Sequence, residues 1–150
     1  MSDFADLYQQ VILDHARRRV GSVRLAQPTG SSHQVNTTCG DEVDLDVVVR
    51  DGRLQEIGWQ AEGCSISQAS LSVLSELLVG RPVAEALALI DQFTALMHAR
   101  GNPEGLDLEA LEDGVAFTGV AKFPARIKCA LLGWMAAKDA MAGSGGEEGL

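Results

Sequence analysis

The period of hydrophobic and polar positions changes along the chain, and these changes outline its elements. Near the start, apolar residues recur every three or four positions, which predicts an amphipathic helix over residues 4–16. Over residues 43–49, apolar and charged side chains alternate instead, as they do in a half-buried strand. An Asp-Gly pair at 51–52 is a hairpin signal, so we expect a return strand over 54–61. A short strand over 33–36 is predicted to lie beside this hairpin.

From Ser65 the apolar spacing becomes helical again. The stretch SISQ at 65–68 fits a capping box, and Gly80 ends the apolar face of this helix. Pro82 suits the first turn of a further helix that runs to about residue 99. His98 falls in its last turn, where we interpret it as complementing the helix dipole and not as a metal ligand.

The last third of the chain combines a loop with a strongly apolar helix. Residues 101–122 are predicted to form a loop with a short helical piece over 107–111. Pro124 opens a final helix that is apolar almost all round, which places this helix in the core. A hairpin followed by helices predicts an α+β fold with a small antiparallel sheet. We expect one domain over residues 1–142 and a disordered tail over 143–150.

Composition narrows the function classes. The chain has 150 residues and a net charge of −9, which argues against nucleic acid as a partner because phosphate binding needs a cationic face. No apolar run approaches the roughly 20 residues that span a bilayer, so no membrane association is expected. The start has no signal-peptide pattern, and we expect a cytoplasmic protein.

The three cysteines all fall near the ends of predicted elements. Cys39 precedes the hairpin, Cys64 lies one residue before a helix cap, and Cys129 occupies the second turn of the last helix. Asp41 follows Cys39 by two positions, and Gly40 between them allows a sharp turn. Three thiolates and a carboxylate suit a tetrahedral zinc site. The spacing alone leaves a second interpretation open, in which each cysteine is a small buried hydrophobe, because no C-x-x-C knuckle is present.

Four stretches of the chain resemble a known family. TTCGDEVDLDVVV, AEGCSISQASLSVL and VAKFPARIKCALLGW resemble the U-type iron–sulfur assembly proteins, and LYQQVILDHARRR resembles their first helix. The resemblance spans residues 6–138 and favours the SufU branch over IscU. IscU proteins carry a histidine directly before the last cysteine, where this chain has Lys128. Residues 92–119 match an insertion that SufU proteins carry. The stretch RRRVGSVR departs from the Asn-Pro-Arg-Asn pattern of the family, so partner contacts of residues 16–24 are not carried over.

The resemblance implies a concrete chemistry and an IscU-like fold. SufU-like proteins bind zinc through residues that match Cys39, Asp41, Cys64 and Cys129. They accept persulfide sulfur from a pyridoxal-phosphate-dependent cysteine desulfurase (SufS-like), and the match to the acceptor is Cys39. Other cluster assembly proteins are the further partners. The match to Arg126 implies a role in moving or neutralising the thiolate, against which stands the interpretation of a solvated arginine at a helix start.

Three alternatives remain at this point. The same thiolates can hold iron or an iron–sulfur cluster, which makes the chain a scaffold for cluster assembly. A purely structural zinc module is the second alternative. The third is a cysteine hydrolase with His15 or His33 as base, for which we find no nucleophile motif.

Overall fold

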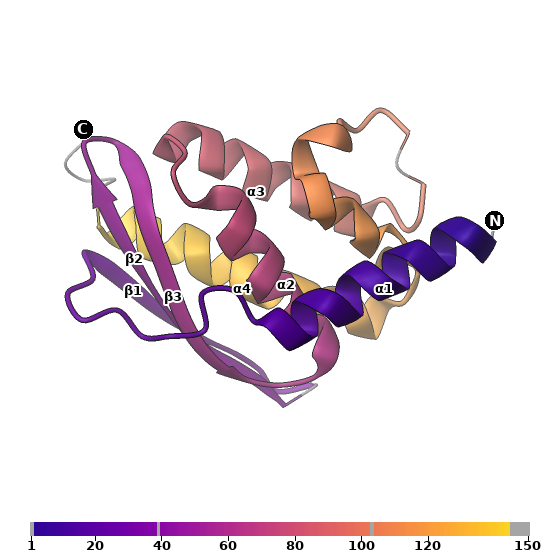
Figure 1. Ribbon diagram of the computed structural model, residues 1–150, viewed down its shortest axis with the longest axis horizontal. Coiled ribbons are helices and arrows are strands. Elements are labelled where there is room, and N and C mark those ends of the chain that lie inside the picture. The colour runs from indigo at the N-terminus through magenta and orange to yellow at the C-terminus, as the bar shows by residue number, and fades with distance from the viewer. Residues whose placement is uncertain (1, 39, 103, 145–150) are drawn as a thin grey trace.

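The computed structural model describes residues 2–38, 40–102 and 104–144. A helix opens the chain, three strands follow, and the remaining elements are helical (Figure 1). The elements are α1 (Ser2–Arg18), β1 (Gly30–Asn36), β2 (Asp41–Arg50), β3 (Arg53–Glu62), α2 (Ser65–Leu78), α3 (Val83–His98), the 3-10 segments η1 (Glu109–Thr118) and η2 (Val120–Lys122), and α4 (Pro124–Gly143). This arrangement confirms the predicted α+β class.

The three strands form an antiparallel sheet in the order β1-β2-β3. Asp51 and Gly52 join β2 to β3 with φ angles of 56° and 74°. Positive φ at both central residues is the requirement of a type I′ hairpin turn, so the predicted hairpin is confirmed. The first strand is longer than predicted, because pairing with β2 already begins at Gly30.

Helices cover one face of this sheet. α4 packs on β1 and β2, α2 lies against α4, and α1 packs on the outer side of α2 (Figure 1). Buried Trp134 links α4 to α2 and α3, since its indole N–H donates to Ser70 Oγ on α2 at 2.7 Å and its ring stacks on Phe93 of α3 with centroids 4.0 Å apart. The final helix is therefore central to the core, as its apolar composition predicts.

The start of α2 differs from the predicted capping box. Cys64 is the N-cap residue, and the helix has no side-chain cap hydrogen bond. Gln68 does not reach back to the cap, because its Nε2 donates to the carbonyl of Ala61 on β3 at 3.3 Å. The Gln68 side chain thus links α2 to the end of β3, and this tertiary hydrogen bond replaces the local capping-box hydrogen bond.

The segment between α3 and α4 is more helical than predicted. The expected loop with one helical piece consists largely of η1 and η2, and Glu112 with φ 50° and ψ −123° breaks η1 into two parts. Of the tail predicted over 143–150, Gly143 still belongs to α4 and Ser144 is buried after it, while residues 145–150 lie outside the described residues. Within the described part, no helix has the length and apolar character needed to cross a membrane.

Candidate metal centre

Asp41 is the first residue of β2 and its carboxylate is almost completely buried, at 1% exposure. Gly40 precedes it with φ 73°, a conformation that favours glycine. One carboxylate oxygen, Oδ1, accepts the backbone N–H of Cys64 at 3.1 Å. The other, Oδ2, is buried and has no hydrogen-bond partner among the described residues. A buried carboxylate oxygen without a partner costs free energy, so this atom needs a cation or a donor that the described side chains do not supply.

Cys64 caps α2 with extended backbone angles, φ −76° and ψ 173°. Its side chain makes no capping bond, and Ser67 Oγ instead donates to the Cys64 carbonyl at 3.0 Å. The preceding residue must be glycine, because a Cβ on Gly63 would overlap the Asp41 carboxylate and the Ser67 hydroxyl. Gly63 therefore lets the chain pass close to Asp41, which puts the N–H of Cys64 on the carboxylate and its sulfur beside it.

Cys129 comes from the other end of the chain, on the second turn of α4. It is buried, at 2% exposure, and its Sγ lies 3.7 Å from the carbonyl oxygen of Ala125. The packing of α4 across the sheet fixes the position of this sulfur. The third donor thus depends on the whole fold, not on the hairpin alone.

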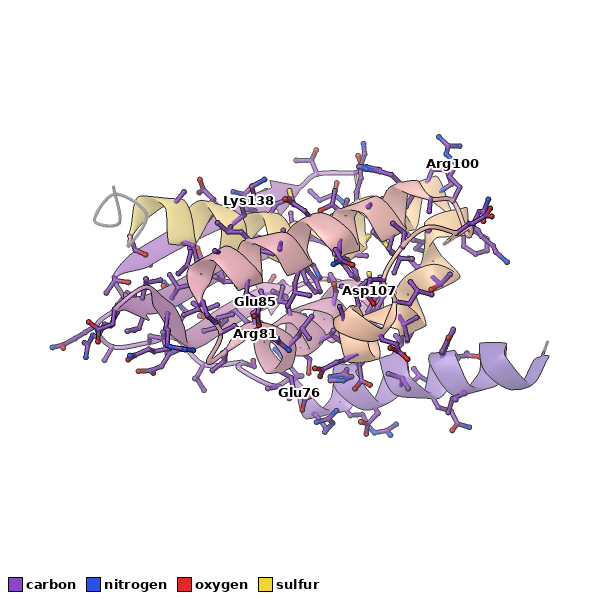
Figure 2. All side chains as sticks on the ribbon, turned by 90° about the horizontal axis from the view of Figure 1, so that it is seen from above. Glu76, Arg81, Glu85, Arg100, Asp107 and Lys138 are labelled. Carbon is purple, nitrogen blue, oxygen red and sulfur yellow. The ribbon has the colours of Figure 1, made fainter. Side chains whose placement is uncertain are left out.

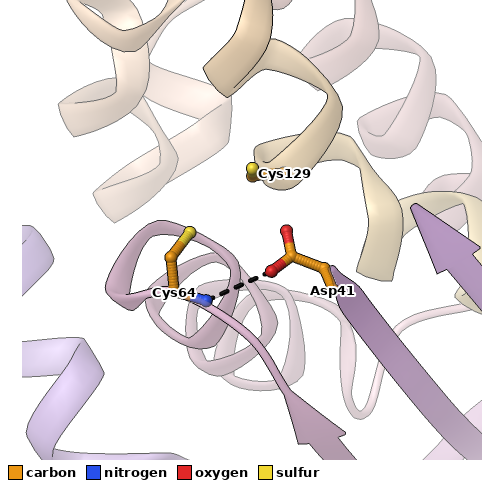
Figure 3. A group of neighbouring side chains, drawn as sticks. All are labelled: Asp41, Cys64 and Cys129. Carbon is orange, nitrogen blue, oxygen red and sulfur yellow. Dashed lines mark hydrogen bonds between the residues drawn. The ribbon is translucent and has the colours of Figure 1, made fainter. Parts of the chain in front are cut away.

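These three residues form one cluster. Their donor atoms, two sulfurs and one carboxylate oxygen, all lie within 4.8 Å of one another. In Figure 3 both sulfurs and the second oxygen of Asp41 face a common space. Cys39, the fourth predicted ligand, lies outside the described residues, in the connection that leads from β1 into Asp41. Thiolates and a carboxylate at this separation fit a zinc ion. The unpartnered Oδ2 of Asp41 also favours a bound cation.

An apolar cleft of about 650 Å³ opens beside the cluster. α1, the start of α2, the η1–η2 segment and the start of α4 line it, and Cys64 lies on its wall. Phe123 is 61% exposed at this cleft, and exposed Arg126 supplies a positive charge. Arg126 thus lines the same cleft as Cys64. Lys128, the residue before Cys129, is exposed.

A second group of potential ligands lies on α1, α2 and η1. It consists of His15, Glu76 and Asp113, whose donor atoms also lie within 4.8 Å of one another. His15 is fully buried, with Nδ1 2.8 Å from Ser72 Oγ and Nε2 2.8 Å from Asp113 Oδ2. Glu76 projects from α2 towards α1 (Figure 2), where it pairs with Arg18 at 3.2 Å.

Neither histidine of the hydrolase alternative joins the cysteines. His15 belongs to the second group, and His33 lies on the outer face of the sheet, 2.7 Å from Asp44 and 3.2 Å from Glu42. No histidine contributes a donor atom to the cluster of Asp41 and the two described cysteines.

The sequence interpretation missed two residues that lie next to Asp41. Gly63 is one, and its signal was a glycine directly before a candidate ligand. Asn36 is the other: it ends β1, pairs with Asp41 across the sheet, and is 9% exposed. Its signal was an asparagine at a strand end three positions before Cys39.

Comparisons with known proteins agree with this fold. Residues 7–130 match the model of the NifU-like N-terminal domain. The chain is 35% identical over 146 residues to a protein from Streptococcus pyogenes serotype M1 named iron–sulfur cluster assembly scaffold protein IscU, covering 94% of this chain and 86% of that one. It is also 35% identical over 138 residues to the Bacillus subtilis protein named zinc-dependent sulfurtransferase SufU, covering 91% and 90%.

A solved structure gives the same picture. It is described as an iron–sulfur cluster assembly scaffold protein for the SUF system from Fervidobacterium islandicum AW-1, and it superposes with a TM-score of 0.81 at 27% identity, covering 87% of this chain and 93% of that one. The fold and the cluster define a U-type assembly protein. The chain belongs to the NifU-like N-terminal domain family. Relatives named IscU and SufU are equally close to it.

Proposed function

We propose that this chain is a zinc-binding sulfur acceptor in iron–sulfur cluster assembly, which takes persulfide sulfur from a pyridoxal-phosphate-dependent cysteine desulfurase. One observation carries the proposal most strongly. Asp41, Cys64 and Cys129 gather their donor atoms within 4.8 Å, and one buried oxygen of Asp41 lacks a partner in the described part of the chain. With Cys39 as fourth ligand, the donor set is three sulfurs and one oxygen.

The proposed ligand set explains why the acceptor thiol is protected and still reactive. Bound zinc keeps its thiolate ligands deprotonated. Three thiolates and a carboxylate around a divalent cation would have a formal charge of −2, so replacement of one anionic ligand by a neutral one from a partner would be electrostatically favourable. The hydrogen bond from the Cys64 backbone N–H to Asp41 Oδ1 would remain, because it does not involve Oδ2.

Cys39 is the proposed acceptor, for reasons of packing. Cys64 caps a helix, and Cys129 is buried inside α4, so moving either sulfur by several ångströms disturbs packed structure. Cys39 precedes Gly40, whose φ of 73° belongs to the turn between β1 and β2. A backbone rotation in a turn is far less costly than moving a core helix.

The transfer itself is a thiol exchange. The Cys39 thiolate attacks the terminal sulfur of the persulfide on the desulfurase, and a new sulfur–sulfur bond forms at Cys39. The sulfur–sulfur bond of the donor breaks, and its cysteine leaves as a thiolate. No outside oxidant or reductant is needed. Arg126, which lines the same cleft as Cys64, is proposed to neutralise the negative charge of the incoming persulfide.

A scaffold for cluster assembly is the second candidate, because relatives named as such are as close as the sulfurtransferase. The absence of a histidine from the described cluster, with exposed Lys128 beside Cys129, favours the acceptor. Anaerobic purification distinguishes the two. Colourless protein with one zinc per chain that stimulates a desulfurase supports the acceptor. Brown protein with labile sulfide supports the scaffold, and zinc without stimulation supports a structural module.

The identity of the acceptor has a direct test. The protein is mixed with desulfurase and cysteine, persulfides are trapped by alkylation, and the adduct is mapped by mass spectrometry. We expect the adduct on Cys39, and we expect Cys39→Ser to lose stimulation while keeping the fold by circular dichroism. An adduct on Cys64 or Cys129 with Cys39 unmodified would overturn the assignment.

A further inference from the structure

We propose that Asn36 is a positioning residue of the metal centre, and that its side-chain amide donates a hydrogen bond to a metal-bound thiolate. The first step is where its side chain lies. Asn36 and Asp41 are directly opposite each other in the β1–β2 ladder. Side chains of opposite residues project from the same face of an antiparallel pair, with Cβ atoms roughly 5 Å apart. Burial agrees, because Ser32 and Asn36 are buried on β1 while His33 and Val35 between them are exposed.

The second step is that this pair carries two unsatisfied groups of opposite kind. Nδ2 of Asn36, a donor, and Oδ2 of Asp41, an acceptor, are both buried, and neither has a hydrogen-bond partner among the described residues. Neighbouring side chains with one free donor and one free acceptor satisfy each other when their role is only structural. Here they do not pair. Each is therefore directed at a third group.

The third step fixes which end of the amide faces the centre. Oδ1 of Asn36 accepts the backbone N–H of Thr38 at 3.2 Å. Exchanging the oxygen and nitrogen of the amide would put two donors face to face, so the assignment follows from the hydrogen bond. With the oxygen committed to the turn, the NH₂ group is the remaining end.

The fourth step identifies the acceptor chemically. An amide NH₂ has donors only and cannot ligate a metal, so its partner must be an anion or a lone pair. The proposed centre holds three thiolates and has an excess of negative charge. Hydrogen bonds to metal-bound sulfurs lower their basicity and tune the centre, as outer-sphere partners do elsewhere. A thiolate sulfur of the centre is thus the acceptor that fits.

This inference rests on the proposed metal centre, and the test uses two variants with a matched control. Asn36→Asp keeps the oxygen that Thr38 needs but removes the donor, whereas Asn36→Ala removes both. Gln34→Glu is the control, because it adds the charge that Asn36→Asp adds, on the same strand face and two residues from Asn36. In the described part of the chain, the Gln34 side chain donates a hydrogen bond to Ser32. Each full-length protein is loaded with Co²⁺ for absorption spectra, and with Zn²⁺ in chelator competition for affinity.

The donor role predicts that both Asn36 variants move the thiolate-to-cobalt charge-transfer bands to longer wavelength. Loss of the N–H donor raises the energy of the sulfur lone pair, and zinc affinity should fall by about 10- to 100-fold. Gln34→Glu should keep the wild-type bands. A role in the turn alone predicts instead that Asn36→Asp matches the wild type in spectrum and affinity, and that result would overturn the inference. Wild-type protein without thiolate-to-cobalt bands would reject the metal centre itself.

Discussion

Two aspartates on β2 are equally buried but differently bonded. Asp46, at 0% exposure, has all its acceptor positions in use: Arg24 donates to both of its oxygens at 2.8 and 3.0 Å, Ser31 Oγ at 2.7 Å and the N–H of Leu25 at 3.1 Å. Asp41, at 1% exposure, has one backbone N–H on Oδ1 and none on Oδ2 in the described part. Burial alone therefore does not distinguish the structural carboxylate of Asp46 from the proposed ligand Asp41. The number of hydrogen-bond partners does.

The pKa of Asp46 shows the effect of hydrogen bonds to both carboxylate oxygens. Burial opposes ionisation of this carboxyl, but the hydrogen bonds from Arg24, Ser31 and Leu25 outweigh it and lower the pKa of Asp46 below its ordinary value. The carboxylate is stable as an anion with protein groups alone. Asp41 has no such arginine: among the described residues no ion pair reaches it, which supports the proposal that a bound cation is its partner.

The same rule separates the two groups of potential ligands. His15, Glu76 and Asp113 lie as close together as the proposed zinc ligands, but Arg18 is already among them, 3.1 Å from His15 Nε2 and 3.2 Å from Glu76 Oε2. The hydrogen bonds that Arg18 donates to Asp14 and Glu76 raise the pKa of Arg18 above its ordinary value, so this cation is permanent. The second group therefore carries its own positive charge and needs no metal.

The largest expected effect is on desulfurase stimulation, and it comes from replacing the carboxylate of Asp41, with the same change at Asp46 for comparison. Asp41→Asn should lower stimulation of a desulfurase by at least about tenfold while zinc stays near one per chain, because three thiolates still hold the metal. Asp46→Asn should leave zinc content and stimulation unchanged. Zinc analysis and cysteine turnover measure both. Full stimulation by Asp41→Asn would remove the carboxylate from the mechanism.

Removal of zinc should lower the melting temperature. A ligand that binds only the folded state at 100 to 1,000 times its Kd stabilises by about 3–4 kcal/mol. For a chain of this length that corresponds to a loss of roughly 6–16 °C in Tm on chelation. Complete unfolding is not expected, since the apolar helices form their own core. An unchanged melt after metal analysis confirms zinc loss would contradict this.

Asp46 should contribute stability that acid removes. Because its pKa is lower in the folded state, the contribution is complete above the ordinary carboxyl pKa and is lost as pH falls through the folded value. Asp46→Asn should therefore cost about 1–3 kcal/mol near neutral pH. In urea titrations, the gap between the two proteins should narrow as the pH is lowered below about 4. A gap that widens on acidification would reverse the sign we derive.

The smallest expected effect on stability comes from a substitution that tests the second group of potential ligands. Arg18→Met should cost less than about 1 kcal/mol, because the ion pairs of Arg18 are half-exposed. It should also create weak binding of a second zinc, since His15, Glu76 and Asp113 then lack a cation. Isothermal titration with zinc measures the stoichiometry. Two sites in the wild-type protein would show that Arg18 does not block this group.

Local patterns predicted the elements well, because period and turn chemistry are local properties. The β2–β3 hairpin followed from alternation and an Asp-Gly pair, and α4 followed from a proline start and an apolar sequence. The extent of η1 was not predicted, and no local sequence signal marks its break at Glu112. The capping box failed for a similar reason: Gln68 bonds to the sheet, which no local rule anticipates.

The residue types of the candidate centre could be predicted, but the neighbouring residues and the unpartnered polar atoms could not. Spacing brought Asp41 and the cysteines into consideration, and the resemblance selected zinc. Which polar atoms remain unpartnered is a tertiary property, so neither Asn36 nor Gly63 was identified. The structure was also needed to show that Asp41 has a carboxylate oxygen without a hydrogen-bond partner, whereas both oxygens of Asp46 have partners.

The route of the chain through the centre has a consequence for folding order. Asp41 and Cys64 lie 23 residues apart, at the same end of the β2–β3 hairpin, so local hairpin formation closes the loop between them. Cys129 arrives only when α4 docks, after most of the chain exists. A growing chain emerges from the ribosome N-terminus first and offers an incomplete ligand set until then. We therefore expect tight metal capture to follow completion of the fold, so that zinc occupancy marks molecules whose synthesis and packing are finished.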